Sequence, residues 1–486
     1  MPEKPNILFI CTDQHRFDAL GCYGNPYIQT PNVDALAADG VLFEQCYVQN
    51  PVCAPSRASL VTGQYPSAHG LWGNGVTLPD DAELFSTALA NDGYDCGMIG
   101  KMHLSHCFAG RTEPRPADDG YRFYKWAHDP SHSSPDNDYH QWLREAHPAH
   151  FERVKDNGQR ERHQAAGFDT MPTEAHYSRW ASERANEFIA EQRDRHEPFF
   201  LWVNFFDPHH PFVAPQEYLD RYDPATLPDP IGYPGELETK PEIQRQASAE
   251  SYAGHARGFG SHSLDEIRQI VAAYYAMVSL IDDEVQRILD SLDDLDLAED
   301  TLVIFTSDHG EMLGDHQLLL KGPMLYDPAV RVPLIMRWPG HLPAGERRAE
   351  LVQWIDLNPT ILDAAGLNPL PASQGMSLLP LARGDADAEP RGWAFCEYLN
   401  SGHPYDPPVF LSMLRHGRYK LIVEHGPPAT TRERTGELYD LIADPHELHN
   451  LWDAPVHADT RICLERKLLD VLVVTRDRSQ PRAAHW

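Results

Sequence analysis

The chain has few cysteines, and none of them is paired at a metal-binding spacing. Its 486 residues contain eight, at positions 11, 22, 46, 53, 96, 107, 396 and 463. No two form a Cys-x-x-Cys pair, so the pattern predicts neither a zinc site nor a disulfide framework. Most are expected to be reduced residues of the core, with Cys53 as the exception developed below.

Long apolar runs are also absent. No stretch approaches the roughly 20 consecutive apolar residues of a membrane span. The first residues, Met1 to Pro5, lead directly into an apolar segment. They lack the charged region, apolar region and cleavage site of a signal peptide. We therefore expect a cytoplasmic protein, although a chain whose signal peptide had been removed would look the same.

Positive charge is scarce. The chain has 41 Lys and Arg against 72 Asp and Glu, for a formal net charge of -31. Such a field repels polyanions, which argues against nucleic acid and anionic membrane surfaces as partners. It also disfavours a highly sulfated polymer, unless basic residues are concentrated at the binding site. The acidic surplus is equally compatible with a saline habitat, and composition does not separate these interpretations.

Four short apolar runs, rich in β-branched and aromatic residues, predict strands buried on both faces. They span residues 6–12, 96–100, 199–206 and 301–306. Helical patterns lie between them, most clearly at 31–40, 86–92, 174–193 and 264–292. This alternation predicts an α/β fold with a large doubly wound, mostly parallel sheet flanked by helices.

After about residue 370 the pattern changes to short strands separated by turns, at 393–398, 412–415 and 419–423, followed by a helix at 460–472. We expect a smaller C-terminal α+β domain with an antiparallel sheet. The predicted division is a catalytic domain over 1–375 and a C-terminal subdomain over 376–486, ending in a polar tail. That tail could be free, or could pack on a neighbouring subunit in a homo-oligomer.

Two segments with weak periodicity, about 105–167 and 213–262, are expected to be insertions in the larger domain. The first is rich in histidine, at positions 128, 132, 140, 147, 150 and 163, in a spacing that fits no standard metal template. An exposed insertion is the simpler interpretation, and a substrate-recognition lid is the sharper one.

Chemically active residues follow each of the four predicted strands at once. They are Asp13-Gln14, Lys101-Met102-His103, Asp207-Pro208-His209 and Asp308-His309. Sites in open parallel sheets form beyond the carboxyl ends of the strands. We therefore expect these groups to converge, although almost 300 residues separate the first from the last.

The segment from Cys53 to Gly63 reads Cys-Ala-Pro-Ser-Arg-Ala-Ser-Leu-Val-Thr-Gly. It resembles the signature of type I sulfatases of the alkaline phosphatase superfamily. Further matching stretches, in the order and rough separations of that family, are 5–8, 18–24, 30–36, 100–104, 208–212, 306–310, 314–316 and 321–322, with a C-terminal match over 437–451. A bare Cys-x-Pro-x-Arg would more simply be a core cysteine before a helix; the extended match favours the family.

The resemblance implies that Cys53 is oxidised to formylglycine (3-oxoalanine) by a maturation enzyme. It also implies one divalent metal, held by Asp13, Gln14, Asp308, His309 and an oxygen of modified Cys53. Mostly oxygen ligands suit a hard cation, and the family implies Ca²⁺. Gln14 stands where many sulfatases carry a second aspartate, so Mg²⁺ and Mn²⁺ stay open.

The family also implies roles for the remaining residues. Arg57 orients the hydrated aldehyde, which attacks sulfur. Lys101 and Lys321 neutralise the sulfate oxygens in the transition state. His209 protonates the leaving alcohol, and His103 takes a proton when the sulfated intermediate collapses. Asn74, in a Gly-Asn-Gly turn, contacts the substrate or simply forms the turn.

The predicted reaction is hydrolysis of sulfate esters to an alcohol and inorganic sulfate. A phosphonate monoester or phosphodiester hydrolase of the same superfamily is the nearest alternative. Those enzymes share formylglycine and the Asp-Gln and Asp-His pairs, but they carry neutral hydroxyl residues where this chain has Lys101 and His103. An alternative of another class is an unmodified, non-catalytic anion-binding protein. The alcohol stays open among carbohydrate, aryl and small alkyl sulfates such as choline sulfate.

Overall fold

A computed structural model describes residues 4–107, 110–157, 171–426 and 435–476. Its centre is an eight-stranded sheet with the order β10-β2-β9-β8-β1-β5-β3-β4. The strands are β1 (Asn6–Thr12), β2 (Val41–Tyr47), β3 (Asp95–Gly100), β4 (Phe123–Trp126), β5 (Phe199–Asn204), β8 (Thr301–Ser307), β9 (Arg331–Arg337) and β10 (Glu346–Gln353). Only β9 among them pairs antiparallel with its neighbours, so the sheet is mostly parallel, as expected.

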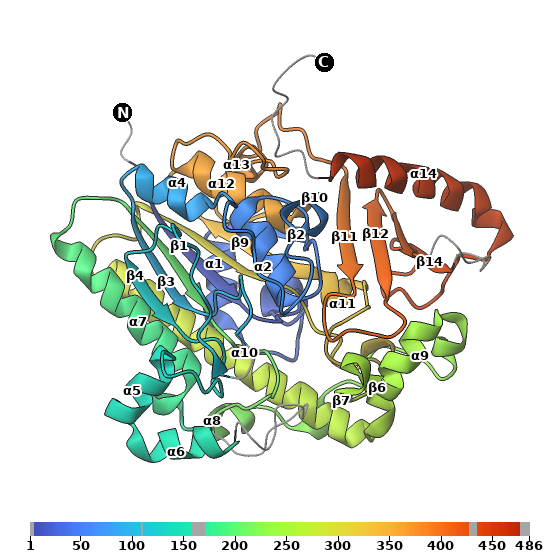
Figure 1. The fold of residues 1–486 in the computed structure, drawn as a ribbon, viewed down its shortest axis with the longest axis horizontal. Coiled ribbons are helices and arrows are strands. Elements are labelled where there is room, and N and C mark those ends of the chain that lie inside the picture. Colours follow the sequence, from blue (N-terminus) through green and yellow to red (C-terminus); the bar gives the residue numbers. More distant parts are fainter. Residues whose placement is uncertain (1–3, 108–109, 158–170, 427–434, 477–486) are drawn as a thin grey trace.

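The central strands are buried on both faces, as their continuous apolar runs predict. In β1, Ile7 and Phe9 belong to one apolar core, and Leu8 and Ile10 belong to another on the opposite face. The helices α2 (Cys53–Thr62), α4 (Phe85–Asn91) and α12 (Leu357–Ala364) pack in the first core. The helices α1 (Pro31–Ala38), α7 (Tyr177–Glu191) and α10 (Leu264–Asp293) pack in the second, giving a three-layer domain (Figure 1).

The sheet is wider than the four predicted strands. On one side β8 is followed by β9, β2 and β10, and on the other β4 forms the edge. Edge strands are less apolar: β10 begins with Glu346, Arg347 and Arg348, and its first residues are exposed or half-buried. Continuous apolar runs mark strands with two covered faces, so the sequence pattern missed the edge strands. It also missed the inner strands β2 and β9, because Glu44 and Gln45 interrupt the apolar run of β2 and Pro333 interrupts that of β9.

The remaining elements of this part of the chain are short or belong to the two predicted insertions. The short helices are α3 (Pro66–His69), α11 (Asp327–Val330) and α13 (Leu379–Arg383). The first predicted insertion holds β4, α5 (Asp138–Ala146) and α6 (Pro148–Asn157); the second holds α8 (Gln216–Leu219), α9 (Glu242–Ala249) and the small pair β6 (Glu250–Ser251) and β7 (Ala256–Arg257). Part of the first insertion, 108–109 and 158–167 with His163, lies outside the described residues.

A second sheet stands beside the first, at the right of Figure 1. Its antiparallel strands are β11 (Trp393–Leu399), β12 (Phe410–His416), β13 (Tyr419–Glu424) and β14 (Gly436–Asp440), in sequence order. Helix α14 (Ala458–Val474) covers it through a third apolar core. The antiparallel sheet and the helix confirm the expected C-terminal architecture. The boundary near residue 375 falls between α12 and α13 and stays a prediction, and most of the polar tail, 477–486, lies outside the described residues.

A buried lysine joins the second sheet to the first domain. Lys420 on β13 is fully buried, and its Nζ lies 2.7 Å from Asp327 Oδ1 and 2.7 Å from Glu447 Oε1. Asp327 begins α11, directly before β9. Glu447 belongs to the same part of the chain as Lys420, so the buried Lys420–Asp327 ion pair is the one that joins the two parts. The Asp327 amide adds a hydrogen bond to Glu447 Oε2 at 2.6 Å.

We expect Lys420→Met to lower the free energy of unfolding by about 3–5 kcal/mol, because two buried carboxylates lose their shared cation. Urea denaturation followed by circular dichroism measures this loss. As a control, Arg466→Met on the exposed side of α14 should change it by less than about 0.5 kcal/mol. A Lys420→Met protein as stable as the parent would show that the ion pairs do not hold the two sheets together.

None of the helices in the described ranges has the length and apolar character needed to cross a bilayer. The longest, α10, runs over 30 residues and packs its apolar side on the central sheet.

Candidate active site

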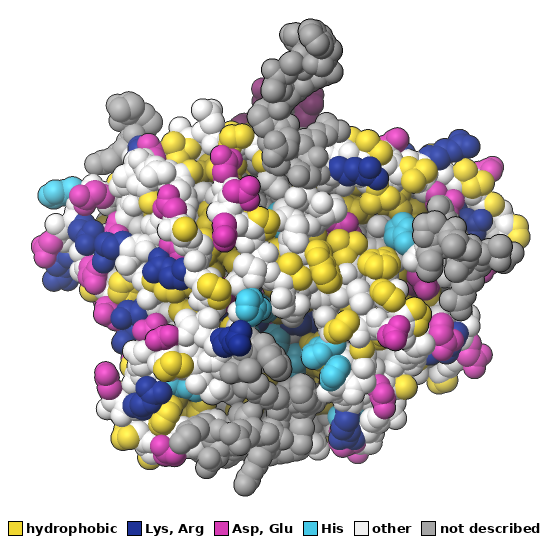
Figure 2. Space-filling view, in the orientation of Figure 1, with side chains coloured by type: hydrophobic (Ala, Val, Ile, Leu, Met, Phe, Trp, Pro, Cys, Tyr) yellow, Lys and Arg dark blue, Asp and Glu magenta, His cyan; other side chains and the backbone are white. Residues whose placement is uncertain are grey.

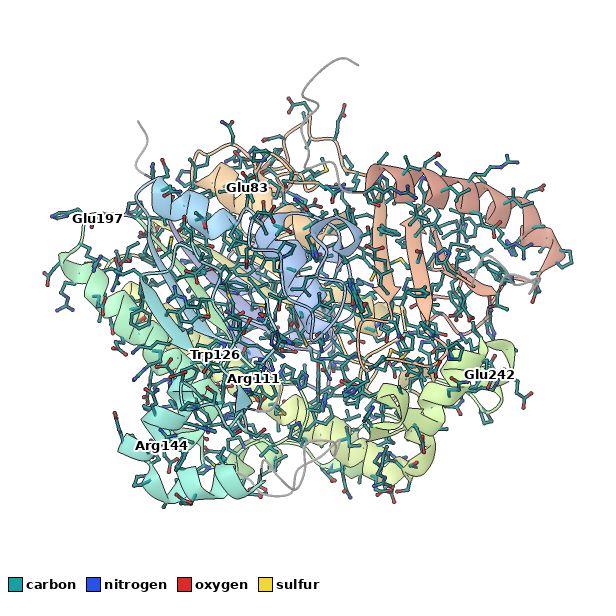
Figure 3. All side chains as sticks on the ribbon, viewed as in Figure 1. Glu83, Arg111, Trp126, Arg144, Glu197 and Glu242 are labelled. Atoms are coloured by element: carbon teal, nitrogen blue, oxygen red, sulfur yellow. The ribbon has the colours of Figure 1, made fainter. Side chains whose placement is uncertain are left out.

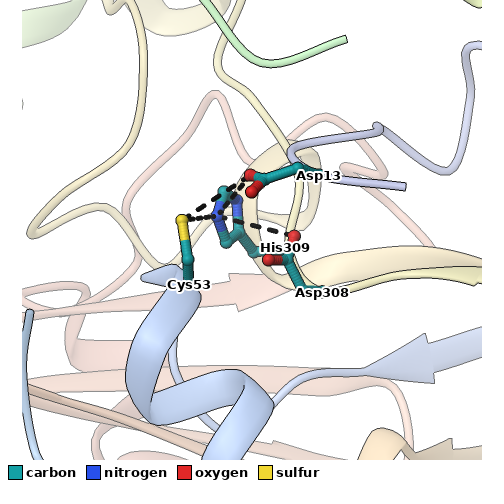
Figure 4. Close-up of side chains that lie close together, drawn as sticks. All are labelled: Asp13, Cys53, Asp308 and His309. Atoms are coloured by element: carbon teal, nitrogen blue, oxygen red, sulfur yellow. Dashed lines mark hydrogen bonds and ion pairs between the residues drawn. The ribbon is translucent and has the colours of Figure 1, made fainter. Parts of the chain in front are cut away.

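The residues that follow the four central strands meet at one edge of the large sheet, around the first residue of α2. Cys53 begins this helix, which is buried along its whole length. Cys53 Sγ lies 3.6 Å from Asp13 Oδ1 after β1 and 3.1 Å from His309 Nε2 after β8 (Figure 4). Parallel strands place their carboxyl ends at a common edge, which explains the convergence.

Four side chains form a set of donors suited to a metal ion. One ligand atom from each of Asp13, Cys53, Asp308 and His309 lies within 4.8 Å of the others, and all four residues are buried. The two carboxylates are oriented by cations behind them. Asp13 Oδ2 pairs with Lys101 Nζ at 2.6 Å, and Asp308 Oδ2 pairs with Arg57 Nε at 2.8 Å.

The opposite oxygen of each carboxylate faces the set. Asp13 Oδ1 lies 3.6 Å and Asp308 Oδ1 3.7 Å from His309 Nε2. His309 Nδ1 lies 2.9 Å from the Gly310 carbonyl, which leaves Nε2 on the side of the carboxylates. Two carboxylate oxygens, one imidazole nitrogen and the Cys53 position therefore fit one divalent cation, with carboxylates favouring a hard ion and the nitrogen compatible with Mn²⁺.

Gln14 and Lys321 lie beside this set. Lys321 Nζ donates to Gln14 Oε1 at 2.8 Å and to Cys53 Sγ at 3.0 Å, and it lies 3.1 Å from His309 Nε2. Gln14 Nε2 donates to Glu311, a fully buried carboxylate that also accepts the Leu313 amide. The Gln14 amide is thus oriented from behind, with its oxygen toward the site.

The cations change the acidity of the cysteine. Burial raises the pKa of the Cys53 thiol, but the charges of Lys101 and Lys321 outweigh burial and hold that pKa well below its usual value. Burial likewise raises the pKa of Asp13, and Lys101 and His209 more than offset it, so the Asp13 pKa is lowered. An anion at the Cys53 position is therefore stabilised by its surroundings.

The two predicted acid–base histidines lie at the same site as the cysteine. His103 and His209 both line the cavity that Cys53 lines. His209 stacks on its neighbour His210, with ring centroids 4.1 Å apart. His210 turns toward Gln14 Nε2, 3.3 Å from its Nδ1, so the two adjacent histidines face different partners.

Two predicted residues make contacts other than those expected. Arg57 is fully buried and binds Asp308, the Lys101 carbonyl at 2.7 Å and Asn204 Oδ1 at 2.7 Å. It thereby fixes the Asp308 carboxylate, and its Nη2 lies 3.5 Å from Asp13 Oδ2. Asn74 Oδ1 accepts the Ala54 amide of α2 at 3.3 Å, so it caps the helix that carries Cys53. Asn74 also lines the cavity described next.

A cavity of about 350 Å³ opens above Cys53 and reaches the first insertion. Its deep end is formed by Cys53, Lys101, His103, His209 and Lys321. Its walls include Asp129, Tyr139 and Met171, together with Tyr252 from the second insertion. Figure 2 shows histidine side chains gathered in the hollow near the centre of this face. A volume of this size suits a small ligand.

Sequence reasoning missed the residues that hold the functional loops. Glu113 is buried and accepts the amides of His103 at 2.9 Å and Ser105 at 3.0 Å, and the Trp126 indole at 3.0 Å. It fixes the loop after β3, where His103 has a left-handed backbone with φ 59°. Glu113 lies in a segment of weak periodicity, and neither it nor Glu311 follows a predicted strand directly, so no local pattern singles them out.

Comparison with known proteins shows similarity to sulfatases over most of the chain. A family model described as Sulfatase matches residues 5–367, and one described as N-sulphoglucosamine sulphohydrolase, C-terminal, matches 314–473. The chain is 32% identical over 483 residues to the uncharacterized sulfatase YidJ of Escherichia coli (strain K12), covering 98% of this chain and 88% of that protein. It is 29% identical over 477 residues to an arylsulfatase of Clostridium perfringens, covering 96% and 94%.

Among solved structures, the chain is similar to the phosphonate monoester hydrolase of Agrobacterium radiobacter. The TM-score is 0.80 and the sequence identity 26%, with 97% of this chain and 96% of that one covered.

Proposed function

Since the chain belongs to the sulfatase family and is a sulfuric ester hydrolase, we propose that it acts through a formylglycine made from Cys53 and one divalent cation. The observation that carries this proposal is the position of Cys53, buried at a helix N-terminus among two carboxylates, three histidines and two lysines. A thiol alone is a poor nucleophile toward a sulfate ester; this setting suits an oxygen nucleophile carrying negative charge.

Formylglycine would supply the nucleophilic oxygen, and the cation would lower the pKa of that oxygen and neutralise charge. Asp13, Asp308, His309 and the oxygen of Gln14 would hold the cation, with Ca²⁺ proposed first and Mg²⁺ or Mn²⁺ as alternatives. Lys101 and Arg57 support this role, since their bonds to Asp13 and Asp308 fix both carboxylates.

The other groups of the site act on the substrate. Lys101 and Lys321 lie on the cavity floor and would bind the sulfate oxygens, whose charge grows in the transition state. His209 would donate a proton to the leaving alcohol oxygen, and His103 would accept one at the Cys53 position. Burial lowers the pKa of His209, which makes its protonated form a stronger acid.

The second candidate function is phosphonate monoester hydrolysis, favoured by the similarity to the Agrobacterium enzyme over nearly its whole length. Lys101 and His103 argue for sulfate, because phosphonate hydrolases of the superfamily carry neutral hydroxyl residues at these two positions, and both residues line the cavity beside Cys53.

We expect kcat/KM on 4-nitrophenyl sulfate to exceed that on 4-nitrophenyl phenylphosphonate by about tenfold or more, because Lys101 and His103 stabilise the sulfuryl transition state. Steady-state release of nitrophenol from both esters measures the ratio under identical conditions, and the leaving group is the same. A higher kcat/KM on the phosphonate would make the second candidate the correct one.

The proposed modification needs a maturation enzyme in the host. Mass spectrometry of the tryptic peptide containing Cys53 distinguishes an aldehyde from a thiol. Protein that carries only the thiol and still turns over sulfate esters would contradict the formylglycine proposal, whereas thiol protein without turnover would fit an anion-binding protein.

A further inference from the structure

Charge divides the active-site cavity into two ends. At its floor stand Lys101 and Lys321, both beside Cys53. No other lysine or arginine is among the described residues that line the cavity, and the lining carries two carboxylates, Asp129 and Asp207. The cationic end therefore matches one sulfate group. Elsewhere the described lining includes histidines, among them His128 and His176, but no lysine or arginine that could bind a second one.

Both floor lysines are already engaged by the site itself. Lys101 pairs with Asp13 at 2.6 Å, and Lys321 donates to Gln14 and Cys53. Neither can move toward the cavity mouth without leaving a buried partner unpaired, which costs free energy. A second anionic group on the substrate would have to find its own counter-charge elsewhere.

One wall of the cavity is largely aromatic and apolar, and it adjoins the floor, since Lys101 Nζ lies 5.6 Å from the centre of the Phe206 ring. Tyr139 and Tyr177 direct their hydroxyls to backbone carbonyls, of Ala175 at 2.8 Å and Ala127 at 2.9 Å, so these hydroxyls are satisfied by the protein. Their rings lie 5.3 Å apart, and the Phe206 ring lies 6.0 Å from that of Tyr177. Val154 and Met171 line the same cavity. This wall suits an aromatic or alkyl group.

Of the two carboxylates, Asp129 is the one whose charge can influence a bound substrate. Asp207 is buried and already accepts the Ser178 hydroxyl, and His176 Nδ1 lies 3.4 Å from it. Asp129 is half-buried, and its Oδ1 accepts the amide and the hydroxyl of Ser131, both at 2.7 Å. These bonds fix a negative charge at the cavity wall without neutralising it.

We propose that the substrate is a sulfate monoester of an alcohol that carries no second negative charge, and that Asp129 excludes anionic alcohols. This inference rests on the proposed sulfatase function and names its substrate class. A fixed carboxylate in a partly desolvated cavity repels a second anion strongly, and it tolerates or attracts a cation. Neutral and cationic aryl or alkyl sulfates are then substrates, and polysulfated or carboxylated sugars are not.

The test compares three phenyl sulfates substituted at position 4: carbamoylmethyl (neutral), carboxymethyl (anionic) and 2-aminoethyl (cationic). The methylene spacers keep the leaving phenols similar in acidity, and the first two substituents have nearly the same shape. We expect kcat/KM for the carboxymethyl ester to be at least about tenfold below that for the carbamoylmethyl ester, with the 2-aminoethyl ester equal to the neutral one or better.

The variant Asp129→Asn keeps an oxygen for the Ser131 bonds and removes the charge. It should shrink the penalty on the carboxymethyl ester, measured as the ratio of its kcat/KM to that of the carbamoylmethyl ester with the same variant, to less than about threefold. Asp136→Asn is the matched control, since it removes the same charge from an exposed position of the same segment outside the cavity lining. It should leave the penalty unchanged.

Equal kcat/KM for the anionic and neutral esters would overturn the inference, as would a penalty that survives in Asp129→Asn. A preference for the carboxymethyl ester that disappears in Arg111→Ala would also overturn it, by showing that this exposed arginine, labelled in Figure 3, supplies a counter-charge to the substrate. Turnover of none of the three sulfates, with turnover of a phosphonate ester, would reject the sulfatase proposal itself and the inference with it.

Discussion

Cys53→Ala is expected to lower kcat/KM on a sulfate ester by about 10⁴-fold or more, to the limit of detection. The side chain that becomes the nucleophile is lost, and removal of a nucleophile removes the covalent route. The lysines, histidines and metal-facing carboxylates would all stay in place. The measurement is steady-state turnover of 4-nitrophenyl sulfate, with the parent enzyme's aldehyde content determined by mass spectrometry.

The same variant should remain folded. Alanine is a good helix residue at the start of α2, and the lost atom is one sulfur, so the free energy of unfolding should change by about 1 kcal/mol or less. Cys46→Ala is the matched control, because Cys46 is also fully buried but lies on β2 in the apolar core. It should lose some stability and keep its activity. Near-parental turnover by folded Cys53→Ala would refute the proposed mechanism.

Asp13→Asn should be the second most damaging change. Removal of the charge weakens cation binding and leaves Lys101, 2.6 Å from the lost carboxylate oxygen, without its anionic partner. We expect kcat/KM to fall by about 10³-fold, because the charge stabilisation supplied by a bound cation is worth several kcal/mol. Chelator treatment of the parent enzyme should have a comparable effect, which the right divalent cation reverses; comparing Ca²⁺, Mg²⁺ and Mn²⁺ identifies it.

Two measurements that do not depend on turnover distinguish loss of the metal from misfolding of the variant. Elemental analysis should find about one equivalent of divalent metal in the parent and much less in Asp13→Asn. Added cation should raise the melting temperature of chelated parent protein, since a ligand at 100 times its Kd stabilises the folded state by about 2.7 kcal/mol. Asp13→Asn should lack this response.

Asp95→Asn is the control for the loss of a buried aspartate. Asp95 lies at the start of β3, at the opposite edge of the same sheet, and binds Arg122 and Arg195. This variant should be less stable, yet retain its metal and its thermal response to added cation. Full metal content in Asp13→Asn, or the same metal loss in Asp95→Asn, would contradict the assignment of Asp13 as a ligand.

The centre of the fold could be predicted because its signal is local. The strands β1, β3, β5 and β8 are continuous apolar runs, and α10 repeats apolar residues at helical spacing. Burial on two faces leaves that pattern in the sequence itself. The edge strand β10 has one end exposed to solvent and carries charges there, so its pattern is weak.

The candidate site followed from the same strands. A residue that closely follows a central parallel strand lies at the carboxyl edge of the sheet, whatever the conformation of the loops. This rule predicted from the sequence that Asp13, Lys101, His209 and Asp308 lie close together. Their supporting partners could not be placed in this way. Glu113 and Glu311 sit within irregular loops, and which amides they accept depends on how those loops fold back.

The sequence by itself determined the reacting residues and the strands that carry them, because both are written in contiguous patterns a few residues long. The tertiary structure alone decided that Arg57 binds the Asp308 carboxylate, that Asn74 accepts the Ala54 amide of the helix beginning at Cys53, and that Asp129 lines the cavity. Each of these depends on contacts between segments tens to hundreds of residues apart, and such contacts are set by sheet register and loop packing, which leave no periodicity in the chain.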